Sequence, residues 1–530
     1  MAPGSSRLRK RSNRNYHFAA TPARRRGWSG HPHKKKIITM KTKRNITTAL
    51  SVLMCISMLT SASAQSSKIP TDPIGGQPPA GSKPSVKDLD YQLKYQRAFE
   101  AVLWGIPAVG IYGFEKGTKE LGFGDNVILA YSGPARQKAE LLTANTVTPY
   151  ILAYTDLRNG PAVLELPAAS EDASLFGQVV DHWQVTIADA VPSGIDKGQG
   201  GKIQLTPPGY SEKIPEGYIH VKSPSYKVNF AFRSIPGPDS TVERAYEYSK
   251  TLKMYYLSEL PNPKPTQFVD PIDMRFSTLP PYDEDFFDDL YQIFSVENAY
   301  PRDKVMMGML ASLGIEKGKP YKPDEKTQKA MRAAAADAFF YMKETFLVGE
   351  PDEPYYEDRQ WRWAQYSDSN RGFSWETDDL LDTEARALHF YHWATYAPNK
   401  LPEKPATVYL GGVLDKDGNE LEAGKTYSLN FPADMPVKQF WSLTIYDYYT
   451  MAFIYNKEDR HGLSSYDMEK KKKNDDGSVT LYFGPKAPEG LEDYWIPTAG
   501  KKPTLYVRFY GPTDAFFDKT FKMPDLELVK

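Results

Sequence analysis

Histidine side chains offer acid–base and metal chemistry, and five of them follow position 64: His182, His220, His389, His392 and His461. His389 and His392 stand three residues apart in a segment with a helical pattern, so both imidazoles would share one helix face and could serve a metal ion. Aromatic residues surround them, however, and no H-E-x-x-H motif is present. The sequence therefore favours histidines packed among aromatic side chains, and it predicts no metal and no cofactor.

His182 is a third candidate for catalysis because an aspartate precedes it. Asp181 and His182 belong to an apolar run, residues 179–187, that predicts a strand. Adjacent strand residues point to opposite faces, so Asp181 could not orient His182 as in a catalytic dyad. No G-x-S-x-G motif supplies a nucleophile either. The candidates His182, His389 and His392 thus indicate at most a hydrolase or lyase that gathers histidines and carboxylates from separate segments.

Two glycine-containing segments are similar to ligand-binding loops but lack the residues that such loops need. In residues 415–420 the glycine comes two positions too early for a calcium loop, and no glutamate stands at the twelfth position. A hairpin turn is the better interpretation. Residues 198–201 lack the Lys-Ser/Thr pair of a phosphate-binding loop, so we expect a simple turn there.

Aromatic residues form two clusters that could contact a ligand. The first lies between predicted helices and comprises Tyr355, Tyr356, Trp361, Trp363 and Tyr366. The second lies on and after a predicted strand and comprises Trp441, Tyr446, Tyr448 and Tyr449, with Asp447 among them. Aromatic side chains in loops often bind sugars or ring-bearing molecules. The alternative is that they fill the junction between two domains.

The pattern of the remaining residues divides the chain into domains. Residues 65–85, rich in Pro and Gly, predict a linker. An N-terminal β-rich domain, residues 86–238, is expected to begin with a helix over 86–104 that Gly105 and Pro107 terminate. Apolar runs between turn residues then predict antiparallel strands at 127–131, 150–154, 162–166, 179–187, 203–205, 218–221 and 228–232.

Helical periodicity dominates residues 239–400, and alternation returns in residues 401–530. The predicted helices cover about 240–261, 284–298, 303–313, 324–346 and 378–396. The C-terminal segment alternates over 479–483 and 505–510, and Gly418 and Gly477, each after an aspartate, indicate hairpin turns. The predicted fold class is therefore multidomain α+β, with two antiparallel β-sandwich-like domains and an intervening helical region.

Charge separates the first 64 residues from the rest of the chain. Residues 1–64 hold 14 Lys and Arg and no acidic residue, so residues 65–530 have a net charge of −14. This acidic part would repel nucleic acid, and we expect no nucleic-acid partner. Residues 40–64 have the basic start, apolar stretch and Ala62-Ser63-Ala64 end of a signal peptide. We therefore expect a periplasmic or secreted protein that begins near Gln65.

Two further expectations follow from the predicted signal peptide. Because a signal peptide normally begins at the initiator methionine, residues 1–39 are expected to be an over-extended start and disordered. The single cysteine, Cys55, would be removed with the signal peptide. The mature chain would then form no disulfide and no zinc–cysteine site, and it would have no membrane span.

Several motifs together carry a family resemblance. In the N-terminal half they are WGIPAV at 104–109, GPAVLELP at 160–167, DKGQGG at 196–201 and PPGY at 207–210; in the C-terminal half they are PVKQFWSLTIYD at 436–447, NDDGS at 474–478, YFGP at 482–485 and FYGP at 509–512. The chain resembles a bacterial family that combines the domains of unknown function numbered 1254 and 1214. The resemblance implies two β-sandwich-like domains, an intervening helical part and export, but no reaction. Where the family has an Asn-x-Asp segment, before Tyr150, this chain has Asn145 and then Val147, so any function of that carboxylate would be lost here.

These observations favour an exported protein that binds a small organic molecule or glycan in an aromatic-lined cleft between its β-domains. The expected ligand-binding residues are Asn145, Tyr150, Trp361, Trp363, Trp441, Tyr446 and Asp447. Two alternatives stay open: the hydrolase or lyase described above, and a structural protein of the cell envelope that forms a homo-oligomer.

Overall fold

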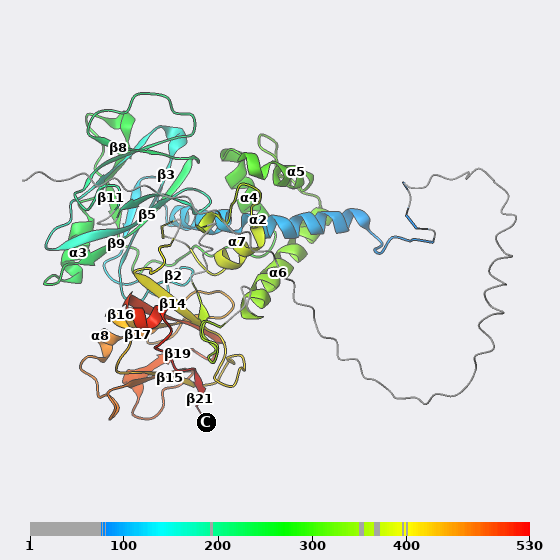
Figure 1. Ribbon diagram of the computed structural model, residues 1–530. Coiled ribbons are helices and arrows are strands. Elements are labelled where there is room, and N and C mark those ends of the chain that lie inside the picture. Colours follow the sequence, from blue (N-terminus) through cyan, green and yellow to red (C-terminus); the bar gives the residue numbers. More distant parts are fainter. Residues whose placement is uncertain are drawn as a thin grey trace, which may run out of the picture. The chain divides into compact units, whose positions relative to one another are not determined.

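The computed structural model describes residues 76, 78–79, 81–190, 194–348, 354–364, 372–394, 397–398 and 401–529. Contacts divide the chain into two compact units, Met1–Lys83 and Pro84–Lys530, and every element below belongs to the second unit. This unit combines helices with several β-sheets, as Figure 1 shows, so the predicted mixed and multidomain architecture is confirmed. The expected signal peptide and the segment before it, residues 1–64, lie outside the described residues.

Two main sheets make up the N-terminal β region. The strand order is β11-β1-β3-β9-β5-β6 in the six-stranded sheet and β10-β4-β7-β8 in the four-stranded sheet. The strands are β1 (Val127–Ala130), β3 (Tyr150–Asp156), β4 (Ala162–Leu166), β5 (Ala173–Val180), β6 (Thr186–Ala190), β7 (Gly201–Thr206), β8 (Tyr218–Lys222), β9 (Lys227–Pro236), β10 (Lys253–Tyr256) and β11 (Gln267–Val269), and a small separate sheet pairs β2 (Ala139–Glu140) with β12 (Phe276–Ser277). Apolar side chains from both main sheets form one common core.

The predicted strands of this region are confirmed with one exception. The run 179–187 is not a single strand, because the Asp181 carboxylate accepts hydrogen bonds from the backbone N–H groups of Trp183 and Val185 and closes a buried turn between β5 and β6. The apolar pattern of the sequence continues through residues 181–185, so the pattern did not indicate a turn there. The expectation of purely antiparallel sheets is also wrong, since β1 pairs with β11, and β7 with β8, in parallel.

Helix α2 (Leu89–Glu120) runs through the positions where the sequence predicts its end. A proline inside a helix removes one hydrogen bond and costs about 3 kcal/mol. Two side chains bind carbonyl groups at this point: Gln184 Nε2 donates to the Pro107 oxygen, and Arg386 Nη2 donates to the Trp104 oxygen, each over 2.7 Å. The second half of α2 is also buried among other helices. Tertiary contacts therefore outweigh the local stop signal.

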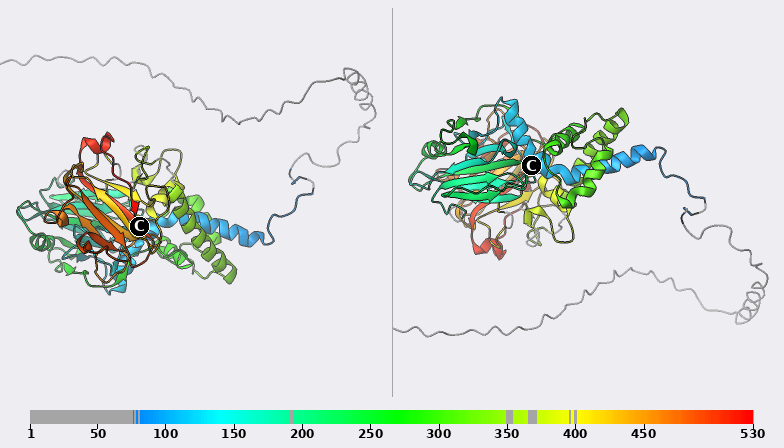
Figure 2. Two further views of the ribbon diagram at one scale, coloured as in Figure 1. Left: turned by 90° about the horizontal axis from the view of Figure 1, so that it is seen from below. Right: turned by 90° about the horizontal axis from the view of Figure 1, so that it is seen from above.

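Four helices pack around α2: α4 (Asp285–Val296), α5 (Lys304–Ser312), α6 (Glu325–Val348) and α7 (Thr383–Phe390). They share one apolar core with α2, and α5 and α6 lie to one side of both β regions in every view (Figures 1 and 2). The sequence predicts all four, although α7 is shorter than expected. Helix α3 (Val242–Ser249) also ends early, because the chain after it forms β10 and pairs with β4.

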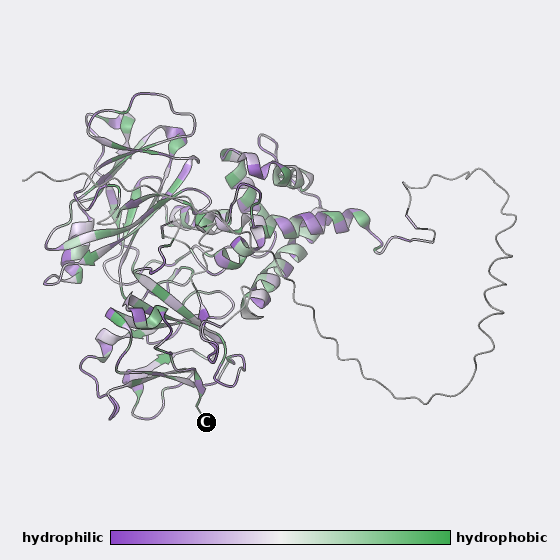
Figure 3. Cartoon of the chain, viewed as in Figure 1, coloured by the Kyte–Doolittle hydropathy of each residue, from purple (hydrophilic) through white to green (hydrophobic). Residues whose placement is uncertain are grey.

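Hydropathy varies along α2. Hydrophilic and hydrophobic residues alternate in its first turns, where Leu89 and Leu93 are exposed, whereas its second half is buried (Figure 3). None of the helices in the described ranges contains a stretch long and apolar enough to cross a membrane.

The C-terminal β region contains a five-stranded sheet of order β13-β14-β20-β16-β17 and a four-stranded sheet of order β19-β18-β15-β21. Its elements are β13 (Arg362–Trp363), β14 (Thr407–Gly412), β15 (Tyr427–Phe431), β16 (Val437–Asp447), β17 (Gly462–Ser464), α8 (Ser465–Met468), β18 (Val479–Gly484), β19 (Trp495–Pro497), β20 (Pro503–Pro512), α9 (Asp514–Phe517) and β21 (Glu527–Leu528). Gly418 and Gly477 have φ angles of 80°, as turn glycines do, so the two predicted turns are confirmed.

The two β regions contact each other directly. Leu129 of β1 and Leu152 of β3 share an apolar core with Tyr409 of β14, Tyr446 of β16 and Tyr506 of β20. Strands that are about 300 residues apart in the sequence are thereby held face to face, and the candidate site lies at this junction.

The close approach of α2 to the chain at Thr278 gives a first prediction. A Cβ atom at Gly113 would stand 2.2 Å from the Thr278 carbonyl oxygen, which belongs to the backbone and cannot move aside cheaply. We expect Gly113→Ala to lower the free energy of unfolding by about 1–3 kcal/mol, as overpacking does. Urea denaturation measures this change.

The matched control is Gly308→Ala, in α5. No atom lies within 4 Å of a Cβ built at Gly308, so alanine should leave stability unchanged or raise it by up to about 1 kcal/mol. Similar stabilities of the two variants would contradict the packing argument.

Candidate functional site

A cavity of about 600 Å³ lies between the two β regions. The six-stranded sheet lines it with residues of β3, β5 and β9, and the five-stranded sheet lines it with residues of β14 and β20. The rest of the lining comes from Phe114 of α2, from residues 141–145 and from described residues between 393 and 406. This volume falls in the range of pockets that enclose small organic ligands.

Strand register explains which side chains of the six-stranded sheet reach the cavity. Arg233 of β9 lies directly opposite Tyr150 of β3 and Phe176 of β5. In the next row on the same face, Ala231 lies opposite Leu152. Side chains of directly paired residues project from one sheet face, and all five of these residues line the cavity.

Arg508 places a buried cation at the junction of the two β regions. Its Nη1 donates to Thr444 Oγ1 over 2.8 Å, and its Nη2 donates to the Thr143 carbonyl oxygen over 2.9 Å and to the Tyr446 hydroxyl over 2.6 Å. The Tyr446 hydroxyl in turn donates to the Ala144 carbonyl oxygen over 2.6 Å. Although burial disfavours the charge, the neighbouring tyrosines hold the pKa of Arg508 above its usual value. None of these hydrogen-bond partners is a carboxylate.

Arg233 brings a second positive charge to the same cavity. Its guanidinium carbon stands 5.5 Å from the centre of the Tyr150 ring, and the side chain is partly exposed. The backbone of Arg233 pairs with β3 and β5, but in the part of the chain that the structure describes its side chain forms neither an ion pair nor a hydrogen bond. Among the described residues that line the cavity there is no Asp, Glu or Lys. Because arginine stays protonated in proteins, the lining carries two guanidinium groups without a counter-charge.

Asn145 and Tyr150, two of the predicted ligand-binding residues, both line this cavity. The Asn145 side-chain amide donates to the Tyr510 hydroxyl over 2.6 Å, and its backbone N–H donates to the Tyr150 hydroxyl over 2.8 Å. The side-chain oxygen Oδ1 of Asn145 accepts a hydrogen bond from the Val147 N–H over 2.6 Å. Asn145 therefore holds the loop in place and positions both phenol groups.

The three predicted tryptophans lie elsewhere, in the core of the C-terminal β region. Trp361 is 1% exposed, and its Nε1 donates to the Pro524 carbonyl oxygen over 2.9 Å. Trp441 stacks on Phe431 with 3.9 Å between ring centres, and Trp363 packs against the same core. Burial of a large aromatic side chain stabilises a fold strongly. The sequence did not reveal that these three side chains pack in or against the core.

Tyr446 and Asp447 lie at the C-terminal end of β16, and both stabilise the structure there. Tyr446 is fully buried and bonded to Arg508, so it supports the cavity without lining it. The Asp447 carboxylate accepts hydrogen bonds from the Tyr449 and Thr450 N–H groups and closes a turn. Tyr366, in the first aromatic cluster, lies outside the described residues.

His389 and His392 are enclosed by aromatic rings, and each is only 1% exposed. His389 packs against Phe373 and Trp375, and His392 Nδ1 lies 2.7 Å from the Tyr506 hydroxyl. Burial lowers the pKa of both, to about 3 for His392, so both are neutral at physiological pH. Within the described ranges no group of three His, Cys, Asp or Glu side chains could hold a metal ion.

His182 lies in the buried turn between β5 and β6, with 3% of its surface exposed. Neither ring nitrogen has a hydrogen-bond partner among the described residues, and Glu297 Oε2 stands 4.0 Å from Nδ1, beyond bonding distance. Burial lowers the pKa of His182 to about 3 and raises that of Glu297 to about 7. The ring borders a second cavity of about 130 Å³, which Glu115 and Lys227 also line.

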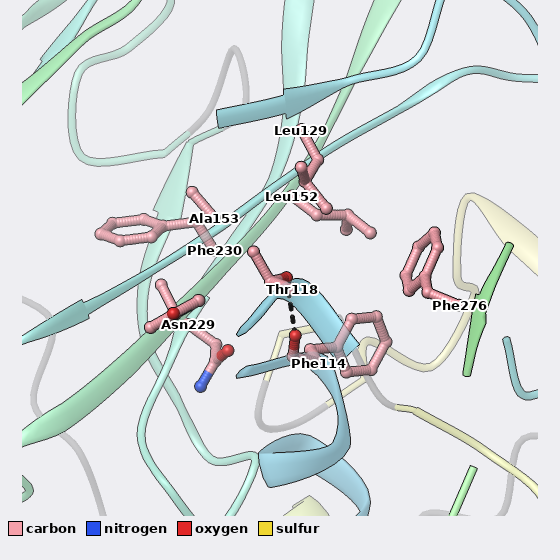
Figure 4. A pocket seen from close by; sticks show the side chains of 9 residues that line it. Phe114, Thr118, Leu129, Leu152, Ala153, Asn229, Phe230 and Phe276 are labelled. Carbon is pink, nitrogen blue, oxygen red and sulfur yellow. Dashed lines mark hydrogen bonds between the residues drawn. The ribbon is translucent and has the colours of Figure 1, made fainter. Parts of the chain in front are cut away.

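A third hollow lies beside α2 and is too small for an organic ligand. Phe114, Leu152 and Phe230 are among its lining residues, and Thr118 Oγ1 donates to the Phe114 carbonyl oxygen there, as Figure 4 shows. Its volume of about 10 Å³ admits about one water molecule. Phe114 and Leu152 also line the large cavity, so the small hollow adjoins it.

Sequence reasoning missed both arginines of the large cavity. Arg508 stands in an alternating strand and Arg233 directly follows one, where a charged residue normally marks the solvent-facing side. The only available signal was that each has large aromatic or apolar residues on both sides, which is typical of a strand buried on both faces.

Two family models match the chain. The one described as "Protein of unknown function (DUF1254)" matches residues 126–256, and the one described as "Protein of unknown function (DUF1214)" matches residues 406–514. The chain therefore carries both domains of the family that its motifs resemble, in the same order. The first contributes β3, β5 and β9 to the cavity and the second contributes β14 and β20, so the cavity lies between the two matched domains.

Comparison with solved structures gives remote similarities, among them the following two. The VPA0106 protein from Vibrio parahaemolyticus is 20% identical over 82% of this chain and 100% of that chain, with a TM-score of 0.48. An uncharacterised protein from Burkholderia cenocepacia is 13% identical over 83% of this chain and 96% of that chain, with a TM-score of 0.37. Both scores are below 0.5, so neither supports an argument about function. No curated protein matches the chain.

Because its histidines His389 and His392 are buried, we expect the folded protein to lose stability in acid. An unfolded histidine binds a proton near pH 6.5, whereas folded His392 does so only at about pH 3. Between these values the unfolded state binds more protons, so stability falls as the pH drops from about 6.5 toward 3. We expect His392→Asn to make the free energy of unfolding depend less on pH between 7 and 4, as measured by urea denaturation at each pH.

The control for this prediction is His220→Asn, which removes an imidazole at an exposed position. If wild type and His392→Asn lose stability equally as the pH falls, His392 is not kept neutral by burial.

Proposed function

We propose that this protein binds a small organic molecule in the large cavity between its two β regions. The observation that carries the proposal is the lining of about 600 Å³: its described residues are mainly apolar and aromatic, and they include two arginines and no carboxylate. Unpaired charges in a largely enclosed space destabilise a fold unless a ligand compensates them. A binding function accounts for why such a lining exists.

The aromatic lining favours a ligand with an apolar body. Trp393 stacks on Tyr409 with 5.0 Å between ring centres, and Phe176 is 39% exposed beside the cavity. A glycan is less well supported, because the side-chain amides that would bind its hydroxyl groups are already engaged. Asn145 bonds to Tyr510, and Gln178 bonds to Asp189.

The sheet arrangement supports the same proposal. We propose that each β region is a two-sheet sandwich, since apolar residues of both sheets contribute to a single core in each region. One outer face of each sandwich would then be left to meet the other domain. The cavity lies where these two outer faces do not fill the space between them.

A hydrolase or lyase function is the second candidate, and one observation favours it. The His182 ring borders the 130 Å³ cavity, and neither ring nitrogen has a hydrogen-bond partner among the described residues. A substrate in that cavity could receive or supply the missing hydrogen bonds. If His182→Gln and wild type hydrolyse a panel of ester and amide substrates equally well, this candidate is excluded.

We also propose that the protein is exported, on the basis of the signal-peptide pattern in residues 40–64. We expect mass spectrometry of the expressed protein to find an N-terminus near Gln65 and cell fractionation to find it outside the cytosol. A full-length chain that still carries Met1 and remains in the cytosol would contradict the proposal.

Filling the cavity tests the binding function. Ala231 projects from β9 into the cavity, so Ala231→Phe should occupy ligand space with an apolar group and leave the sheet intact. A screen of neutral and charged organic compounds by thermal shift and calorimetry would identify ligands of the wild type. We expect Ala231→Phe to bind each of them at least about tenfold more weakly, with an unfolding midpoint close to that of wild type.

The control variant is Ala433→Phe, which adds the same ring at an exposed position outside the cavity. It should keep wild-type affinity. Binding that survives in Ala231→Phe, or a screen in which wild type binds no compound, would argue against the proposed function.

A further inference from the structure

The charge of the cavity narrows the class of ligand, on the condition that the proposed binding function is correct. We infer that the ligand is an organic anion whose carboxylate group pairs with Arg233 and whose aliphatic or aromatic body packs against the apolar lining.

The cavity has an excess of positive charge. Arg233 and Arg508 both line it, and the lining residues within the described ranges include no acidic side chain. Burial and the charge of Arg508 act to lower the pKa of Arg233, but the neighbouring Tyr150, Tyr409 and Tyr510 outweigh these effects, so the pKa of Arg233 is raised and the group stays charged. In an enclosed space of low dielectric constant an anion would be attracted strongly, whereas a cation would be repelled.

Arg233 rather than Arg508 is available to the ligand. Both Nη atoms of Arg508 donate to protein oxygens, and these bonds hold the two β regions together. The Arg233 side chain makes no hydrogen bond within the described ranges, and its guanidinium lies over the Tyr150 ring. A ring below the guanidinium plane leaves the N–H groups at its edge free to donate.

The surroundings of Arg233 suit a carboxylate. The planar guanidinium can donate two parallel hydrogen bonds to the two carboxylate oxygens. The neighbouring Tyr150 hydroxyl accepts a hydrogen bond from the Asn145 N–H, so its own proton is left to donate. Phe176, on the other side of Arg233, is 39% exposed and offers an apolar surface to the part of the ligand that follows the carboxylate.

Matched pairs of probes test this inference. Decanoate and 2-naphthoate carry the anion, and decanamide and 2-naphthamide have the same bodies without the charge. We expect calorimetry to show that wild type binds the carboxylates about 10- to 100-fold more tightly than the amides, the range expected for hydrogen bonds between charged groups. Arg233→Gln should abolish that preference. Arg244→Gln, which removes an exposed arginine from α3, should keep it.

A second measurement needs no ligand. If Arg233 is an unpaired cation kept for binding, Arg233→Gln should raise the unfolding midpoint of the free protein at low salt, and Arg244→Gln should not. A lower midpoint in Arg233→Gln would overturn the inference, because it would show that the charge is already compensated within the protein.

The outcomes separate this inference from the proposed function. Equal binding of acids and amides, unchanged in Arg233→Gln but lost in Ala231→Phe, would overturn the anion assignment and leave the binding function in place. If wild type binds none of the four probes, both the anion assignment and the proposed function are rejected for ligands of this size.

Discussion

The hydrogen bonds of Arg508 are the interaction on which the junction of this protein depends. The guanidinium lies on the central strand of the five-stranded sheet and reaches the carbonyl groups of Thr143 and Ala144 in the other β region, partly through Tyr446. Removing a charged group from water is expensive, and neutral oxygens compensate it less completely than a carboxylate would. The two β regions can therefore keep this arginine buried only while they stay together, which couples the fold of one to the position of the other.

Arg386 in the helical layer follows the same principle. It is buried, and within the described ranges no carboxylate forms a hydrogen bond with it. It donates to the Trp104 carbonyl oxygen near the proline of α2 and lies 4.8 Å from the centre of the Trp183 ring. Burial and the nearby Arg302 lower its pKa to about 9. Backbone carbonyls and aromatic faces thus replace carboxylates as partners of buried arginines at two places, and at each place the arginine joins segments far apart in the sequence.

Arg233 differs from these two arginines in what surrounds its guanidinium group. The other two use their guanidinium groups to connect parts of the protein, whereas Arg233 has an aromatic ring beneath it and a cavity beside it. Stability alone gives no reason to keep a charge in that position. The same cross-strand register that places Tyr150 and Phe176 beside it also fixes its direction, so the sheet holds the group in place without using its donors.

The sequence by itself determined the local elements, because short-range patterns encode them. Alternation specified strands such as β18, an apolar run between turn residues specified β4, apolar periodicity specified α4 and α6, and Asp-Gly pairs specified two hairpin turns. It also placed Asn145 and Tyr150 among the candidates, through a resemblance that both matched domains support. Tertiary structure decided what no local pattern encodes. It continued α2 through Pro107, turned the chain at Asp181, buried Trp361 and Trp441 in a core and opened a cavity beside Arg233. Each outcome depends on partners dozens to hundreds of residues away, and burial of a side chain is a property of the packed fold and not of its neighbours in the sequence.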